Sequence, residues 1–235
     1  MANERSESVV DKYPQNCVNV LLSFGLKQND QALDLGCGQG NQMQQLAEIG
    51  INNVTGIDVN PDNLPTDNMV VVADWNKMPF KENIFDCAYM FSSPLSESSS
   101  EKYSEVSRVL KPGGIFIYDD IVFEELMRTH TLRESQLTEE KVIPLQEDAD
   151  GNQITIVQES FLEEKSHKRL IKVRTYNRGD LVFSDDYSST VKSLDQHRSG
   201  LLPFGFEYVG VVTIHQESKD NLLEPRTFLK FVKTL

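Results

Sequence analysis

The sequence contains no hydrophobic segment near the length of a transmembrane helix. Such a helix needs about 20 apolar residues, and no run of that kind occurs in the 235 residues. The N-terminal residues 1–8 also lack the apolar core of a signal peptide. These absences predict a cytoplasmic protein that does not bind a membrane.

Cysteine is scarce, with Cys17, Cys37 and Cys87 as the three examples. An odd number at scattered spacing suits neither a disulfide framework nor a metal cluster, so no metal site is predicted. Cys37 stands between two glycines, where a small side chain that fits is a better explanation than a nucleophile.

Positive charge is also in short supply. The chain has 23 lysines and arginines against 36 acidic residues, for a net charge of −13. Binding to nucleic acid depends on neutralising phosphates with basic side chains, so this balance argues against a nucleic-acid partner. One basic stretch, Lys165–Arg174, is expected to be either the solvated face of a strand or a patch for an acidic substrate group.

The most informative stretch combines a short apolar run with a glycine-rich turn. Ala32–Leu35 reads as a buried strand that carries one acid, Asp34, and Asn41–Glu48 reads as a helix. Between them stand three glycines at alternate positions: Gly36, Gly38 and Gly40. Glycines let a ligand approach the backbone closely, and the start of a helix favours polar or anionic groups.

The spacing of these residues indicates which ligand the turn binds. A dinucleotide fingerprint is G-x-G-x-x-G, whereas this turn is G-x-G-x-G, with Asp34 two residues before it. An acid there suits a ligand with an ammonium group and repels a pyrophosphate. The segment Leu33–Gly40 resembles the first motif of the class I S-adenosylmethionine-dependent methyltransferases. That resemblance implies an α/β Rossmann-like fold, S-adenosylmethionine as cofactor, and contacts to it from Asp34, Gly36, Cys37, Gly38 and Gly40.

Acidic residues follow the next two expected strands. Asp58 ends the strand 53–59, about twenty residues beyond the turn, where an acid meets ribose hydroxyls in such folds. The apolar run 70–73 predicts a third, buried strand, reached by a short connection that is rich in proline and asparagine. By resemblance, Val59 packs on adenine and Asp74 accepts from its amino group. Trp75 either stacks on adenine or belongs to the core.

The residues 83–91 resemble the fourth strand of the family, and the string 108–114 resembles its turn into the fifth strand, 115–118. Phe91 is then expected beside the methionine part of the cofactor. No Asn-Pro-Pro-Tyr or Asp-Pro-Pro-Tyr follows the fourth strand. In the family this lowers the odds of methylation on a nucleobase or glutamine amino group.

The catalytic candidates lie where the fifth strand ends. Methyl transfer from a sulfonium needs a close, aligned acceptor, and needs a base only if the acceptor must lose a proton. Tyr118, Asp119 and Asp120 fall at the carboxyl end of a strand, the edge at which open α/β sheets bind ligands. The two aspartates are the preferred bases. Weaker candidates are Tyr13, Tyr187, His197 and His215.

The pattern changes to an antiparallel meander over residues 121–189, with strand-like segments near 154–156, 170–174 and 181–183. We interpret it as a β insertion between the fifth and sixth core strands, which either shapes the acceptor pocket or forms the interface of a homodimer. The core comprises 1–120 and 190–235. Its residues 1–25 form either a lid or a helix that covers the sheet edge. A helix near 191–194 and the strands 208–214 and 227–232 close a seven-stranded sheet.

The resemblance implies transfer of a methyl group to an O, N or activated C atom of a small-molecule metabolite, which leaves S-adenosylhomocysteine. Three alternatives stay open: a catalytically silent cofactor-binding regulatory partner, a protein-directed methyltransferase, and an aminopropyltransferase. The last is less favoured, because the acidic pair typical of polyamine sites is not evident in the sequence.

Overall fold

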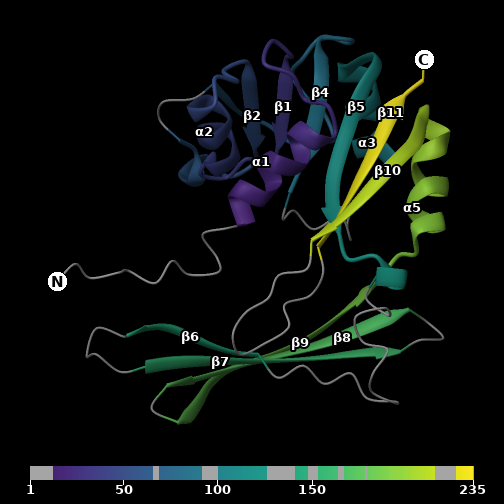
Figure 1. Cartoon of the computed structure of the whole chain (residues 1–235). Coiled ribbons are helices and arrows are strands. Elements are labelled where there is room, and N and C mark those ends of the chain that lie inside the picture. The colour runs from purple at the N-terminus through teal and green to yellow at the C-terminus, as the bar shows by residue number, and fades with distance from the viewer. Residues whose placement is uncertain are drawn as a thin grey trace. The chain divides into compact units, whose positions relative to one another are not determined.

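A computed structural model describes most of the chain. The described residues are 13–65, 69–91, 100–125, 141–147, 153–163, 167–177, 179–214 and 226–234. The chain divides into two compact units (Figure 1). The first comprises residues 1–120, 195–216 and 226–235, and the second comprises 121–194 and 217–225.

The first unit is built on a seven-stranded sheet with the order β10-β11-β5-β4-β1-β2-β3. Strands β1 to β5 pair in parallel, while β11 runs antiparallel to both β5 and β10. The predicted seven-stranded α/β sheet, closed by a terminal hairpin, is thereby confirmed. The strands are β1 (Ala32–Leu35), β2 (Val54–Asp58), β3 (Val70–Val72), β4 (Phe85–Met90), β5 (Leu110–Asp120), β10 (Phe206–Ile214) and β11 (Arg226–Lys233).

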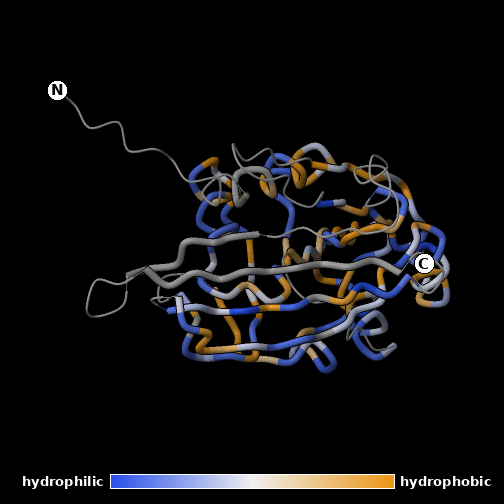
Figure 2. Tube along the Cα trace, turned by 90° about the horizontal axis from the view of Figure 1, so that it is seen from below, coloured by the Kyte–Doolittle hydropathy of each residue, from blue (hydrophilic) through white to orange (hydrophobic). Residues whose placement is uncertain are grey.

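Helices cover both faces of this sheet, and hydrophobic stretches alternate with hydrophilic ones along the chain (Figure 2). On one face a buried cluster joins Leu21, Met43 and Tyr89. On the other face the rings of Phe116 and Phe206 lie 5.7 Å apart. The helix predicted near 191–194 begins only at residue 194. The helical elements are α1 (Tyr13–Ser23), α2 (Asn41–Glu48), η2 (Pro61–Asn63), α3 (Ser100–Val109), α5 (Leu194–Leu201) and η4 (Leu202–Phe204).

The central strands are almost completely buried, and the edge strand is not. All four residues of β1 are buried, as expected for a parallel strand with helices on both faces. The prediction that β3 is buried is wrong, because its residues are half-buried or exposed. β3 is the last strand of the sheet, and among the described residues 59–91 the single helical turn is η2. The predicted short connection therefore leaves β3 without a covering helix.

The string predicted to turn the chain into the fifth strand interrupts the register of β5. Phe85 pairs with Leu110, but Cys87 pairs with Ile115, so residues 111–114 bulge out of the ladder. The Lys111 ammonium lies 2.8 Å and 2.9 Å from the two carboxylate oxygens of Asp86. Asp86 also accepts from the backbone N–H that precedes β1. These contacts make Asp86 a structural residue.

The second unit contains a four-stranded antiparallel sheet with the order β6-β7-β8-β9. The antiparallel insertion between the fifth and sixth core strands is confirmed. Its first strand was not among the strand-like segments predicted from the sequence. No helix in the described part of the chain is long and apolar enough to cross a membrane. The strands are β6 (Lys141–Glu147), β7 (Gln153–Glu163), β8 (Lys168–Asn177) and β9 (Asp180–Thr190).

At Gly56, β2 packs tightly against Cys37 of the glycine turn and Met43 of α2. A Cβ atom at Gly56 would lie 2.7 Å from Cys37 Sγ and 2.8 Å from Met43 Sδ. We therefore expect Gly56→Ala to lower the free energy of unfolding by about 1–3 kcal/mol, as for other overpacked cores. Urea denaturation would measure it. The matched control is Gly210→Ala in β10, whose Cβ would meet no atom within 4 Å. Equal midpoints for the two variants would contradict this packing.

Candidate functional site

The turn between β1 and α2 is a left-handed bend made of glycine. Gly36, Gly38 and Gly40 have φ angles of 74°, 50° and 74°, a region that side chains other than glycine rarely adopt. A Cβ atom at Gly38 would meet no atom within 4 Å. The bend is therefore open on that side, and the predicted sequence of strand, glycine turn and helix is confirmed.

Hydrogen bonds tie this bend to the end of β2. The backbone N–H groups of Gly36 and Cys37 both donate to the carbonyl oxygen of Ile57, over 2.8 Å and 3.0 Å. The N–H of Gly38 donates to Asp58 Oδ2 over 3.0 Å, and Asp58 Oδ1 accepts from the next loop over 2.9 Å. A carboxylate has about four acceptor positions. Asp58 therefore keeps acceptor capacity on both oxygens for hydroxyl groups of a ligand.

Asp34 is a buried acid at the base of the bend. It pairs in register with Tyr89 of β4, so the two side chains leave the sheet on the same face. Burial raises the pKa of the Asp34 carboxyl to about 7, while the Tyr89 hydroxyl lowers it and the charge of Asp58 raises it further. Among the described residues, neither Asp34 Oδ2 nor the Tyr89 hydroxyl has a hydrogen-bond partner of ordinary geometry.

A buried carboxyl with an unused oxygen is costly unless a donor or cation meets it. Asp34 therefore has the chemistry to receive an ammonium group. The sequence did not single out Tyr89, because the register between β1 and β4 is what brings the two residues together. The signal available was a polar ring within the apolar run that follows Asp86 in β4.

The Cys37 thiol is buried and packs toward Gly56. Burial, followed by the charges of Asp34 and Asp58, raises its pKa to about 12. The thiol is therefore protonated at neutral pH, which is unsuitable for a nucleophile. Its position in the bend is explained by the size of the side chain.

The residues expected around adenine lie at the ends of β2 and β3. Val59 is 63% exposed, so its apolar surface is available to a ring. Asp74 accepts hydrogen bonds from the backbone and side chain of Asn76, which hold the pKa of its carboxyl below the ordinary value. Trp75 is half-buried, and the Lys102 ammonium lies 4.6 Å from its ring centroid. Contact of these side chains with adenine stays a prediction.

Phe91 lies directly after β4 and is buried. Its ring centroid is 5.4 Å from that of Tyr89 and 5.3 Å from that of Phe228. Phe91 thus packs beside the pair formed by Tyr89 and Asp34, at the carboxyl end of the sheet. Its expected contact with the methionine part of the cofactor also stays a prediction.

The three catalytic candidates at the end of β5 have different surroundings. The Tyr118 hydroxyl lies 3.0 Å from His197 Nδ1. The Asp119 side chain is 0% exposed, and its Oδ2 lies 3.2 Å from Arg226 Nη1. The Asp120 side chain is 29% exposed, and its Oδ2 lies 3.7 Å from His197 Nε2. Asp120 is therefore the acid of this set that is open enough to meet a ligand.

Three of the weaker candidates cannot be compared in this way. The side chains of Tyr13 and Tyr187, and the whole of His215, lie outside the described residues.

Arg226 was missed by the sequence reasoning. The hairpin of β10 and β11 brings it to Asp119, which is 107 positions away in the chain.

Residues 33–118 match a family model described as a methyltransferase domain. A sterol 4-C-methyltransferase of Caenorhabditis elegans is 34% identical over 110 residues, which are 41% of this chain and 33% of that protein. A sterol 24-C-methyltransferase of Gibberella zeae is 35% identical over 107 residues, which are 40% of this chain and 28% of that protein. The chain thus spans about a third of the length of these curated relatives.

Solved structures resemble the chain over most of its length. The CcbJ methyltransferase of Streptomyces caelestis has a TM-score of 0.64 at 13% identity, and the match covers 99% of this chain and 94% of that one. The S-adenosylmethionine-bound amino pentose methyltransferase CalS10 of Micromonospora echinaspora has a TM-score of 0.63 at 14% identity, with 98% and 93% covered. The chain thus has the fold of the class I, Rossmann-like S-adenosylmethionine-dependent methyltransferases, and its residues 33–118 match a methyltransferase domain.

Proposed function

We propose that this protein binds S-adenosylmethionine and transfers its methyl group to an O, N or activated C atom of a small molecule. The observation that carries the proposal is the buried Asp34 carboxyl, whose Oδ2 has no hydrogen-bond partner among the described residues. It lies at the base of a glycine bend that Asp58 holds at the end of β2. This arrangement fits an ammonium group at Asp34 and a ribose diol at Asp58.

The bound cofactor would supply a methyl group on a sulfonium, which is already a good leaving group. The protein's part is to bind and align. Asp58 accepts hydrogen bonds from the ribose hydroxyls, and Asp34 pairs with the ammonium group of the amino-acid tail. The open side of Gly38 lets the ligand approach the backbone closely. Holding two reactants close and aligned can supply much of a catalytic effect.

The small-molecule acceptor is supported by the names of similar proteins. The two curated relatives above are named for methylation of sterols, and the CalS10 structure is named for an amino pentose. These acceptors differ from one another, but none is a protein or a nucleic acid. The net charge of −13 also disfavours a nucleic-acid acceptor.

The test is transfer of label from methyl-labelled S-adenosylmethionine into an extract of the source organism, separated into small molecules and proteins. We expect label in the small-molecule fraction, and much less of it when Asp34→Asn replaces the wild type. Label in the protein fraction would instead favour a protein-directed enzyme. Binding of the cofactor without any transfer would favour a silent regulatory partner.

A further inference from the structure

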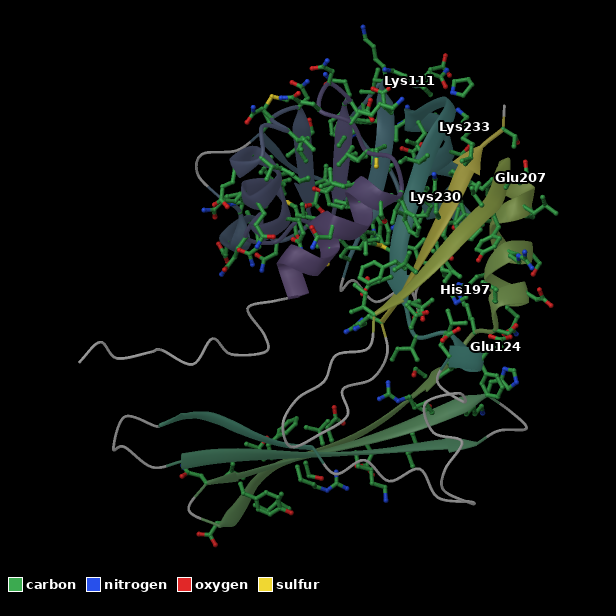
Figure 3. All side chains as sticks on the ribbon, in the orientation of Figure 1. Lys111, Glu124, His197, Glu207, Lys230 and Lys233 are labelled. Atoms are coloured by element: carbon green, nitrogen blue, oxygen red, sulfur yellow. The ribbon has the colours of Figure 1, made fainter. Side chains whose placement is uncertain are left out.

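A buried histidine of α5, His197, faces the carboxyl end of β5. His197 is 1% exposed, and both of its ring nitrogens face residues of β5. Nδ1 lies 3.0 Å from the Tyr118 hydroxyl and Nε2 lies 3.7 Å from Asp120 Oδ2. Figure 3 shows His197 at the end of the sheet opposite to Lys111 and Lys233. It is thus at the edge where ligands of open α/β sheets bind.

The chemistry of the neighbours sets the direction of the hydrogen bonds. Burial, followed by the charges of Tyr103 and Asp120, raises the pKa of the Tyr118 hydroxyl well above its ordinary value, so this hydroxyl keeps its proton. A carboxylate beside Nε2 favours the tautomer with the proton on that nitrogen. Nδ1 then accepts from Tyr118. Tyr118 then donates to His197, while the 3.7 Å between Nε2 and Asp120 Oδ2 is an electrostatic contact that exceeds hydrogen-bond distance.

Other ionisable groups on the surrounding elements are oriented differently. On α5, Arg198 lies 3.5 Å from Asp195 and 4.4 Å from the ring centroid of Tyr208 in β10. On β5, Asp119 pairs with Arg226 of β11. Among the ionisable groups that face His197 or Tyr118 are Tyr103 of α3 and Asp120 of β5.

The position of Asp120 also suits contact with an acceptor. β5 is two strands from β1 in the sheet, and neighbouring strands are about 4.8 Å apart. The end of β5 is therefore on the order of 10 Å from the glycine bend across the sheet, a span that a nucleoside with an amino-acid tail can bridge. Asp119, at the same edge, is enclosed and paired.

We propose that Asp120 is the general base of the methyl transfer and that His197, fixed by Tyr118, is the positioning residue that orients its carboxylate. This inference rests on the proposed function and narrows the acceptor to an atom that loses a proton when it is methylated. The acceptor atom gives its proton to Asp120 and bonds to the methyl carbon. The sulfur–methyl bond breaks, and its electron pair stays on sulfur to form the thioether product.

The experiment measures label incorporation into the small-molecule extract across pH, with calorimetric binding of S-adenosylhomocysteine as a check on folding. We expect Asp120→Asn to lower incorporation about 100-fold or more, the usual range for a lost general base, without weakening binding of S-adenosylhomocysteine. The matched control is Asp195→Asn, which removes a 91% exposed carboxylate from α5. It should behave as wild type.

Two variants of the histidine test the positioning role. His197→Leu removes the N–H that faces Asp120, so incorporation should fall while binding of S-adenosylhomocysteine is kept. His197→Gln keeps an N–H group at a similar position and should restore most of the wild-type rate. Near-wild-type incorporation by Asp120→Asn would overturn the base assignment. Wild-type incorporation by folded His197→Leu would overturn the role of His197. If the leucine variant does not fold, a His197→Gln variant as impaired as Asp120→Asn would overturn it. Wild type that incorporates no label would instead contradict the proposed function itself.

Discussion

Replacing Asp34 by Asn should stabilise the ligand-free protein above pH 7 and, in the same variant, weaken binding of S-adenosylmethionine. The two effects share one cause. Burial raises the pKa of the Asp34 carboxyl from an ordinary 3.8 to about 7, so ionising it inside the fold costs free energy. An ammonium group from the cofactor would offset that cost, whereas the amide of Asn carries no charge to meet it.

The sign of the stability effect follows from proton linkage. Between pH 3.8 and about 7 the folded protein holds a proton on Asp34 that the unfolded chain has lost, so wild-type stability falls as pH rises through that window. One unit of pKa corresponds to about 1.4 kcal/mol. We therefore expect the free energy of unfolding of Asp34→Asn to exceed that of wild type by about 2–4 kcal/mol at pH 8. The difference should vanish near pH 4. Urea denaturation at the two pH values measures it.

The binding effect has the opposite sign. Loss of one partner from a buried charge pair typically costs 2–5 kcal/mol. We therefore expect Asp34→Asn to lower the affinity for S-adenosylmethionine by at least about 30-fold. Wild-type affinity should rise with pH up to about 7, because the ammonium group requires the ionised carboxyl. Calorimetry in buffers of different ionisation enthalpy would show release of a proton below that pH.

The ligand control is 5′-methylthioadenosine, which lacks the amino-acid tail. Its affinity should depend neither on pH in this range nor on the Asp34→Asn change. If both ligands lose affinity equally in the variant, Asp34 supports the bend as a whole and does not receive the ammonium group.

Asp58→Ala should weaken binding of S-adenosylmethionine and of 5′-methylthioadenosine alike, by about 100-fold or more. Two hydroxyl hydrogen bonds to a charged group are worth about 1.5–3 kcal/mol each. The substitution also removes the acceptor that holds the N–H of Gly38 over 3.0 Å, so the bend loosens. Isothermal titration calorimetry gives both affinities.

The matched control for this prediction is Asp62→Ala, which removes an exposed acid from η2, four positions further along. It should leave both affinities unchanged. Unchanged affinity in Asp58→Ala would show that the ribose does not contact Asp58. A loss of affinity for S-adenosylmethionine alone would show that Asp58 contacts the amino-acid tail instead.

The parts of the fold that sequence reasoning predicted are those encoded locally. The glycine bend needs left-handed φ angles at Gly36, Gly38 and Gly40, and that requirement is visible in the residue types. The acid at the end of β2 is visible in the same way, because it follows an apolar strand at a fixed distance from the bend. Local signals of this kind can be recognised in the sequence without knowledge of distant contacts.

The parts that were missed depend on contacts between distant segments. Tyr118 and His197 are 79 positions apart. Tyr89 meets Asp34 through strand register alone. The apolar run of β3 gave no sign that it would lie at the sheet edge. Composition and periodicity describe a segment's own preferences and do not determine its neighbours.

The most direct test of the account is a crystal structure of the protein with S-adenosylhomocysteine bound. We expect the ribose hydroxyls to donate to Asp58, the amino group to lie within hydrogen-bond distance of Asp34 Oδ2, and the tail to pass the open side of Gly38. A ligand that binds elsewhere, or a bend that instead takes the pyrophosphate of a dinucleotide, would contradict the account.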